Sequence, residues 1–181
     1  MTHTLVALVQ DNPGVLNRVV SLVRRRNFNI ESLTVGHSET PGISRLTLVV
    51  QAADVEQIIK QLYRLIEVLK VSDVSSDPVV EREIALVKLH VTRPSRAELV
   101  ALANVFEAKI VDVAPTSMII EITGSPDEVE RFVELVRPFG IKEMMRTGRI
   151  AMVRGPQTHR LTSDADAQEN SRPDAAALAV V

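Results

Sequence analysis

The sequence has no cysteine and no tryptophan, and it holds only one tyrosine and four phenylalanines in 181 residues. Without cysteine the chain has no disulfide framework, no thiolate nucleophile and no thiolate metal site, which fits a reducing compartment. Small α+β proteins that read RNA stack bases on aromatic side chains of their sheet, and this chain offers little of that platform. These absences exclude thiol chemistry and disfavour RNA recognition on a sheet.

An excess of one charge and a long apolar run are also lacking. The 21 lysines and arginines nearly balance the 23 acids, and the net charge of -2 gives no reason to expect a nucleic-acid or membrane partner. No apolar stretch approaches the roughly 20 residues of a membrane-spanning helix. The first strand-like run, residues 4–9, starts too close to Met1 for the charged segment of a signal peptide. We therefore expect a cytoplasmic protein.

Catalytic and metal-binding sets are missing as well. The four histidines are scattered along the chain without the spacing of metal ligands: His3, His37, His90 and His159. Paired carboxylates, a serine elbow and a phosphate-binding glycine loop are absent too. We expect no catalytic residue, no metal and no cofactor in this chain, and hence no enzyme activity of its own.

What the sequence does contain is the same order of elements twice: strand, helix, two strands, helix, strand. Apolar residues at helical spacing predict the helices, and short apolar runs between turn residues predict the strands. In the first copy, strands are predicted at residues 5–9, 29–35, 43–50 and 68–74, and helices at 15–23 and 55–66. In the second copy, strands are predicted at 84–91, 109–113, 118–122 and 141–145, the last continuing toward Met152, and helices at 99–106 and 129–136.

This repeated order predicts an α+β fold of two consecutive ferredoxin-like βαββαβ sandwiches, each with helices on one face of a four-stranded antiparallel sheet. We place the first domain at residues 1–76, a linker at 77–83 and the second domain at 84–156. Residues 157–181 lack periodicity and are rich in polar residues and alanine, which predicts a disordered tail.

The starts of the four predicted helices differ in one respect. Three begin with a capping box, in which the cap and the residue three positions later satisfy free backbone amides. These pairs are Asp54 with Gln57, Ser95 with Glu98, and Ser125 with Glu128. The first helix has Asn12 as its predicted cap and Val15 at the third position, so no acid occupies that end.

The open start of the first helix suits a small zwitterion. Pro13 costs nothing at the first position of a helix, and Gly14 has no side chain to block the amides. Free amides and the positive end of the helix dipole favour a carboxylate, and Asp11 could hold the ammonium of the same molecule. Asn-Pro-Gly is also an ordinary turn from a strand into a helix, so local chemistry alone leaves both interpretations open.

Residues 11–16, Asp-Asn-Pro-Gly-Val-Leu, resemble the Asp/Asn-x-x-Gly-x-Leu turn of ACT domains, which bind amino acids. Three further blocks resemble the regulatory small subunit of acetolactate synthase, also called acetohydroxyacid synthase. They are Asn-Ile-Glu-Ser-Leu-Thr-Val at 29–35, Ser-Arg-Leu-Thr at 44–47 and Val-Glu-Arg-Glu-Ile-Ala-Leu-Val-Lys at 80–88. The resemblance covers residues 5–154 and identifies the first domain as an ACT domain.

The resemblance implies an ACT homodimer in which the glycine turn of one chain meets Asn29 and Ile30 of a second copy. The residues that it assigns to the effector site are Asp11, Asn12, Gly14, Val15, Leu16, Asn29 and Ile30. Amides of the turn would bind the carboxylate of valine, or of leucine or isoleucine, and Asp11 would face the ammonium. Members of the family often have Asn in place of Asp11, and the charge of Asp11 could either strengthen the hold on the ammonium or repel the carboxylate.

The resemblance also implies a catalytic large subunit as the partner, carrying thiamine diphosphate, Mg²⁺ and FAD, whereas this chain would stimulate it and confer feedback inhibition by valine. The second domain has Thr-Arg-Pro-Ser-Arg at residues 92–96 in place of the glycine turn, so we expect no amino acid there and a contact with the catalytic subunit instead. The alternative is an ACT regulator of another enzyme or of transcription. The transcriptional form would need a helix-turn-helix, and none is predicted.

Overall fold

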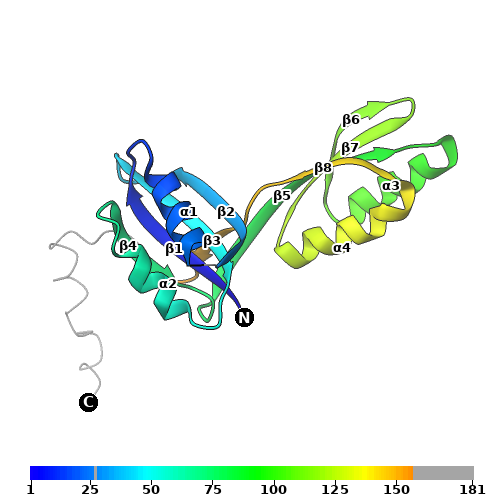
Figure 1. Cartoon of the computed structure of the whole chain (residues 1–181). Coiled ribbons are helices and arrows are strands. Elements are labelled where there is room, and N and C mark those ends of the chain that lie inside the picture. Colours follow the sequence, from blue (N-terminus) through cyan, green and yellow to red (C-terminus); the bar gives the residue numbers. More distant parts are fainter. Residues whose placement is uncertain (27, 157–181) are drawn as a thin grey trace, which may run out of the picture.

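The computed structural model describes residues 1–26 and 28–156, and the predicted tail at 157–181 lies outside them. The first domain consists of β1 (Thr2–Gln10), α1 (Val15–Arg25), β2 (Asn29–His37), β3 (Ile43–Gln51), α2 (Val55–Leu62) and β4 (Val68–Asp73). The second consists of β5 (Val79–His90), α3 (Arg93–Val105), β6 (Lys109–Ala114), β7 (Ser117–Gly124), α4 (Pro126–Val136), η1 (Arg137–Phe139), β8 (Ile141–Arg146) and β9 (Ile150–Val153). Figure 1 shows two lobes, with β5 running from one to the other. The predicted pair of βαββαβ domains is confirmed.

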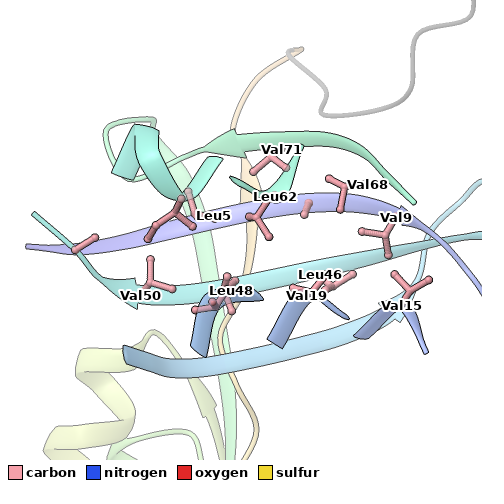
Figure 2. Close-up of a cluster of buried hydrophobic side chains, with 14 residues drawn as sticks. Leu5, Val9, Val15, Val19, Leu46, Leu48, Val50, Leu62, Val68 and Val71 are labelled. Atoms are coloured by element: carbon pink, nitrogen blue, oxygen red, sulfur yellow. The ribbon is translucent and has the colours of Figure 1, made fainter. Parts of the chain in front are cut away.

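The strands of the first domain form an antiparallel sheet in the order β2-β3-β1-β4, with α1 and α2 on one face. Helix α1 buries Val15, Val19 and Val23, which are spaced four residues apart and therefore share a face. Helix α2 buries Ile58 and Leu62. Figure 2 shows several of these side chains meeting apolar side chains of β1, β3 and β4. This order places β2 at an edge, where its outer backbone groups have no strand partner among the described residues.

The second domain repeats this arrangement with the strand order β6-β7-β5-β8 and with α3 and α4 over one face. Its core contains Phe132 of α4, which is fully buried. The ring of Phe132 meets the ring of Phe106 edge to face, with centroids 5.4 Å apart. The two domains therefore have separate cores built on the same plan.

Strand β5 corrects the expected linker at 77–83, because it begins at Val79 and runs without a break to His90. Its first residues pair with β9, from Val79 opposite Val153 to Arg82 opposite Ile150. The predicted last strand is likewise two strands, β8 and β9, separated by residues 147–149. The start of β5 and β9 lie on the face of the first sheet opposite its helices, where Val6, Val74, Ala151 and Val153 form a third buried cluster.

Of the three predicted capping boxes, the structure confirms one, in which Ser125 and Glu128 satisfy each other's backbone amides. Asp54 caps α2 by accepting a hydrogen bond from the Gln57 amide, but the Gln57 side chain does not return one to the Asp54 amide, so only half of that box forms. The predicted capping box of Ser95 with Glu98 is wrong. Helix α3 begins at Arg93, Thr92 is its cap and Ser95 is the reciprocal partner, because Pro94 fits the first turn of a helix and moves the start toward the N-terminus. No helix in the described part of the chain is long and apolar enough to cross a membrane.

Candidate functional site

The turn between β1 and α1 is built around Gly14, whose φ of 86° places it in the left-handed region. This conformation is easy for glycine and unfavourable for other residues. It also corrects the predicted cap, because a left-handed residue between Asn12 and Val15 prevents a helix from starting at Pro13. Gly14 occupies the cap position, with no side-chain cap, and the Asn12 side chain instead donates to Gln10 Oε1 at 3.1 Å.

The start of α1 leaves backbone amides without acceptors. The Val15 amide reaches the Asn12 carbonyl at 3.3 Å, and the Arg18 amide donates to the Gly14 carbonyl at 3.0 Å. Within residues 1–26 and 28–156, the amides of Gly14 and Leu16 donate no hydrogen bond. The first turn of α1 also carries no acidic residue. The Asn17 amide likewise donates no hydrogen bond within these residues, so the turn presents three free donors and the positive end of the helix dipole, which together suit a carboxylate.

The side chains of the turn divide between the core and the surface. Val15 is 4% exposed and can offer a ligand only its backbone, whereas Leu16 is 44% exposed and provides an apolar surface beside the free amides. The Arg18 guanidinium forms an ion pair with the Glu67 carboxylate, which is nearly buried. This pair anchors the first turn of α1 to the segment that precedes β4.

Asp11 lies beside a residue that the sequence interpretation did not connect with it. Its backbone amide donates to the Gly42 carbonyl at 2.8 Å, and its Oδ2 lies 3.3 Å from His37 Nδ1. Both side chains are open to solvent, at 44% exposed for Asp11 and 86% for His37. The carboxylate is therefore accessible to an ammonium group, and a protonated His37 would compete for it. The signal in the sequence was the hairpin at 36–42, which returns residue 37 to the end of β1.

Asn29 and Ile30 lie far from the glycine turn of their own chain. Asn29 pairs with Gln51, which pairs with Thr2 at the start of β1, whereas the glycine turn follows Gln10 at the other end of that strand. Eight residues of antiparallel strand separate the two positions by roughly 25 Å. One chain therefore brings together Asp11, Asn12, Gly14, Val15 and Leu16 but not Asn29 or Ile30.

The corresponding position of the second domain is closed by its own side chains. The Thr92 amide donates to Ser95 Oγ at 2.9 Å, and the Ser95 amide donates to Thr92 Oγ1 at 3.3 Å. No left-handed glycine precedes α3. Among the described residues, no group of three or more His, Cys, Asp or Glu side chains is placed to hold a metal ion. The glycine turn is thus the candidate site of this structure.

Both domains resemble known families. Residues 5–70 match the family model of the AHAS small subunit-like ACT domain, and residues 82–155 match that of the small subunit of acetolactate synthase. A probable acetolactate synthase small subunit from Archaeoglobus fulgidus is 54% identical over 157 residues, which cover 86% of this chain and 98% of that protein. The acetolactate synthase small subunit from Bacillus subtilis is 43% identical over 160 residues, which cover 87% of this chain and 93% of that protein.

A solved structure extends the likeness to three dimensions. The crystal structure of the small subunit of acetolactate synthase from Thermotoga maritima superposes with a TM-score of 0.80 at 43% sequence identity. The match covers 86% of this chain and 98% of that one, so it includes both domains. With two family models on consecutive domains and relatives of this identity over nearly their whole length, this chain belongs to the family of acetolactate synthase small subunits.

Proposed function

We propose that this chain is the regulatory subunit of a cytoplasmic acetolactate synthase, that it binds valine at the Gly14 turn, and that it both stimulates a catalytic large subunit and makes it sensitive to feedback inhibition. The observation that carries the proposal is the pair of free amides at Gly14 and Leu16, at a helix start without an acid. Leucine and isoleucine have the same charged groups and are the natural competitors. The regulated pathway would be branched-chain amino acid biosynthesis.

The contacts with the amino acid follow from the chemistry of the turn. The carboxylate accepts hydrogen bonds from the Gly14 and Leu16 amides, where the helix dipole adds to its stabilisation. The ammonium meets the Asp11 carboxylate, and the branched side chain contacts the exposed side chain of Leu16. Hydrogen bonds to charged groups contribute about 1.5–3 kcal/mol each, so the two charged ends dominate the affinity.

A homodimer would complete the site. Strand β2 is an edge strand, and two copies can pair their β2 strands antiparallel about a two-fold axis. In such a pair, the Asn29 end of one β2 lies beside the His37 end of the other. Asn29 and Ile30 of one copy then close the glycine turn of the second copy, which the separation of roughly 25 Å prevents within one chain.

In this proposal, the catalytic large subunit carries out the reaction. The catalytic large subunit is proposed to carry thiamine diphosphate, Mg²⁺ and FAD, and this chain is proposed to hold none of them. Family membership supports the pairing with a large subunit.

Titration calorimetry of the full chain with valine, leucine and isoleucine tests the sensor. We expect binding of at least one of them, with a much weaker signal for valinamide, which keeps the ammonium and lacks the carboxylate. The absence of a binding signal for all three amino acids would refute the proposal. Copurification with a thiamine-dependent acetolactate synthase large subunit, followed by activity with and without valine, tests the partnership, and we expect stimulation by the chain and inhibition by valine.

A further inference from the structure

The segment between β8 and β9 lies directly against β2 of the first domain. We call Thr147, Gly148 and Arg149 the joint loop. A Cβ atom built on Gly148 would overlap Thr34 Oγ1 and would come within 3.0 Å of the Leu33 carbonyl oxygen. Glycine is therefore needed here for a close approach of two backbones and not for an unusual φ. The contact joins the end of the second domain to β2, the strand of the first domain that carries Asn29 and Ile30.

Arg149 ties the joint loop to three strands. Its backbone amide lies 3.5 Å from Ser32 Oγ on β2. Its Nη1 donates to Thr4 Oγ1 on β1 at 3.4 Å and to Glu81 Oε1 on β5 at 3.3 Å. These strands come from both domains, so the position of Arg149 depends on how the domains are placed relative to each other.

On the side of the second domain, Arg146 connects the joint loop with the helical layer. Its guanidinium donates to the nearly buried Glu83 carboxylate at 2.7 Å and to Glu130 of α4 at 2.6 Å. Arg146 bridges the two carboxylates, each bound by a different nitrogen, which restricts the orientation of its side chain. A displacement of the joint loop would therefore move Arg146 and disturb its ion pairs with Glu83 of β5 and Glu130 of α4.

The joint is also the place where buried polar atoms are left unsatisfied. Among residues 1–26 and 28–156, the buried side-chain polar atoms without a hydrogen-bond partner are Thr34 Oγ1 and Arg149 Nε. Both belong to the contact between β2 and the joint loop. Such atoms cost free energy that is recovered when water reaches them, so they lower the stability of the closed joint. A cavity of about 500 Å³ beside the loop, lined by Leu33, Glu83 and Arg146 among others, leaves room for the movement.

Strand β2 connects this joint to the proposed effector site. Asn29 and Ile30 come first along the strand, and Ser32, Leu33 and Thr34 follow directly at the joint. The register of β2 against β3 shifts between Ile30 and Ser32, which marks a β-bulge at Glu31. A bulge bends the strand and interrupts its ladder of hydrogen bonds. The two contacts are thus neighbours on one strand, on either side of this bend.

We propose that the contact of Gly148 with β2 couples the effector site to the second domain, so that closing Asn29 and Ile30 on an amino acid moves β2 and shifts the joint loop with β8 and β9. This coupling rests on the proposed function. Valine binding at the turn and transmission of its effect through the joint loop are then separate properties. A change at Gly148 should affect the transmission and leave the binding intact.

The test compares Gly148→Ala with Gly155→Ala in the full chain, alone and with the catalytic large subunit. Both add one methyl group at a glycine, but nothing lies within 4 Å of a Cβ at Gly155, and its φ of 83° makes Gly155→Ala the more strained of the two changes. We expect both isolated variants to bind valine as the wild type does. In the holoenzyme, the valine concentration for half inhibition should rise about fivefold or more for Gly148→Ala, in the usual range of coupling, and stay unchanged for Gly155→Ala. Inhibition of Gly148→Ala at wild-type valine concentrations would overturn the coupling.

A second variant separates a blocked contact from a damaged fold. Thr34→Ala removes the hydroxyl that the new methyl group would overlap, so Gly148→Ala with Thr34→Ala should regain part of the valine inhibition. No recovery would place the defect elsewhere and would refute the contact as the coupling element. Should Gly148→Ala not fold, Arg149→Met removes the bonds to Thr4 and Glu81 without adding volume, and it should raise the inhibitory valine concentration in the same way. If the wild type neither binds nor responds to branched-chain amino acids, the proposed function fails, and the coupling fails with it.

Discussion

Helices α1 and α3 follow the first strand of two copies of the same topology, but they begin in different ways. Helix α1 follows a left-handed Gly14 and has no side-chain cap, whereas α3 follows Thr92, which exchanges hydrogen bonds with Ser95. A helix end can be satisfied by the chain itself or left for water or a ligand. Of these two copies, the first leaves the start of its helix open and the second closes it with its own side chains.

Closing the open end should have the largest effect. Gly14→Asp places a carboxylate beside the free amides, where it competes with the carboxylate of the effector. The loss of hydrogen bonds to a charged group, about 1.5–3 kcal/mol, should raise the inhibitory valine concentration by about tenfold or more. Stimulation of the catalytic subunit should persist. The measurement is the activity of the reconstituted holoenzyme over a range of valine concentrations.

Gly155→Asp is the matched control for this change. Gly155 has a φ of 83° and nothing within 4 Å of a built Cβ, so it carries the same backbone strain without an adjacent helix start. It should leave valine inhibition unchanged. If Gly14→Asp lost stimulation together with inhibition, the cause would be misfolding and the turn would lose its assigned role.

Mixed dimers should show whether the open end is completed by a second copy. A chain with Gly14→Asp has a blocked turn and an intact Asn29, and a chain with Asn29→Ala has the reverse. A dimer of the two would contain one site with both parts intact if the site lies between chains, and none if it lies within one. We expect calorimetry of differently tagged, copurified mixed dimers to regain about half of the wild-type valine sites. Mixed dimers that bind no valine would contradict a shared site.

Removing the polar side chain before the helix should destabilise the chain at the capped start of α4 but not at the uncapped start of α1. Ser125→Ala removes the cap of α4 and should lower the free energy of unfolding by about 1 kcal/mol, or the melting temperature by about 2–4 °C. Asn12→Ala should be close to neutral, because the Asn12 side chain bonds only Gln10 and does not cap α1. Urea unfolding at one protein concentration measures both. Equal losses would mean that Asn12 caps α1 in solution.

The sequence predicted the features that depend on neighbours along the chain. Helical spacing and short apolar runs predicted the repeated order of elements, and Ser125 with Glu128 predicted the start of α4. The cap of α1 was wrong because Asn12 and Pro13 are both favourable at a helix start. The positive φ of Gly14 outweighs those preferences. The sequence places free amides at residues 14–16, and in the structure those of Gly14 and Leu16 are free whereas the Val15 amide makes a weak bond to the Asn12 carbonyl. The contact of Asp11 with His37 was not predicted.

Features that depend on distant segments could not be predicted in the same way. Residues 79–82 follow Ser, Ser, Asp and Pro and therefore resemble a linker, but they become strand because β9, some 70 residues later, pairs with them. One sign was present in β1, where residues 4–9 are all buried and Leu5, Val6, Ala7, Leu8 and Val9 form an unbroken apolar run. Such a run indicates a strand covered on both faces. What covers the second face is the start of β5 and β9.

The smallest expected effect is a difference between the two kinds of helix start in how stability depends on pH. Hydrogen bonds from the Ser125 backbone amide and hydroxyl, at 2.7 Å and 2.8 Å, lower the pKa of Glu128 from its ordinary 4.5. Because the folded state lowers this pKa, its contribution to stability is complete above about pH 4.5 and is lost as the pH falls through the folded value. Glu128→Gln should therefore be slightly less stable than the wild type at pH 7, and the difference should shrink as the pH is lowered below 4.5, as measured by urea unfolding at a series of pH values. A difference that stays constant down to the lowest pH at which the chain is folded would show that the charge of Glu128 does not support α4. Helix α1 has no acid in its first turn, so its start should show no such titration.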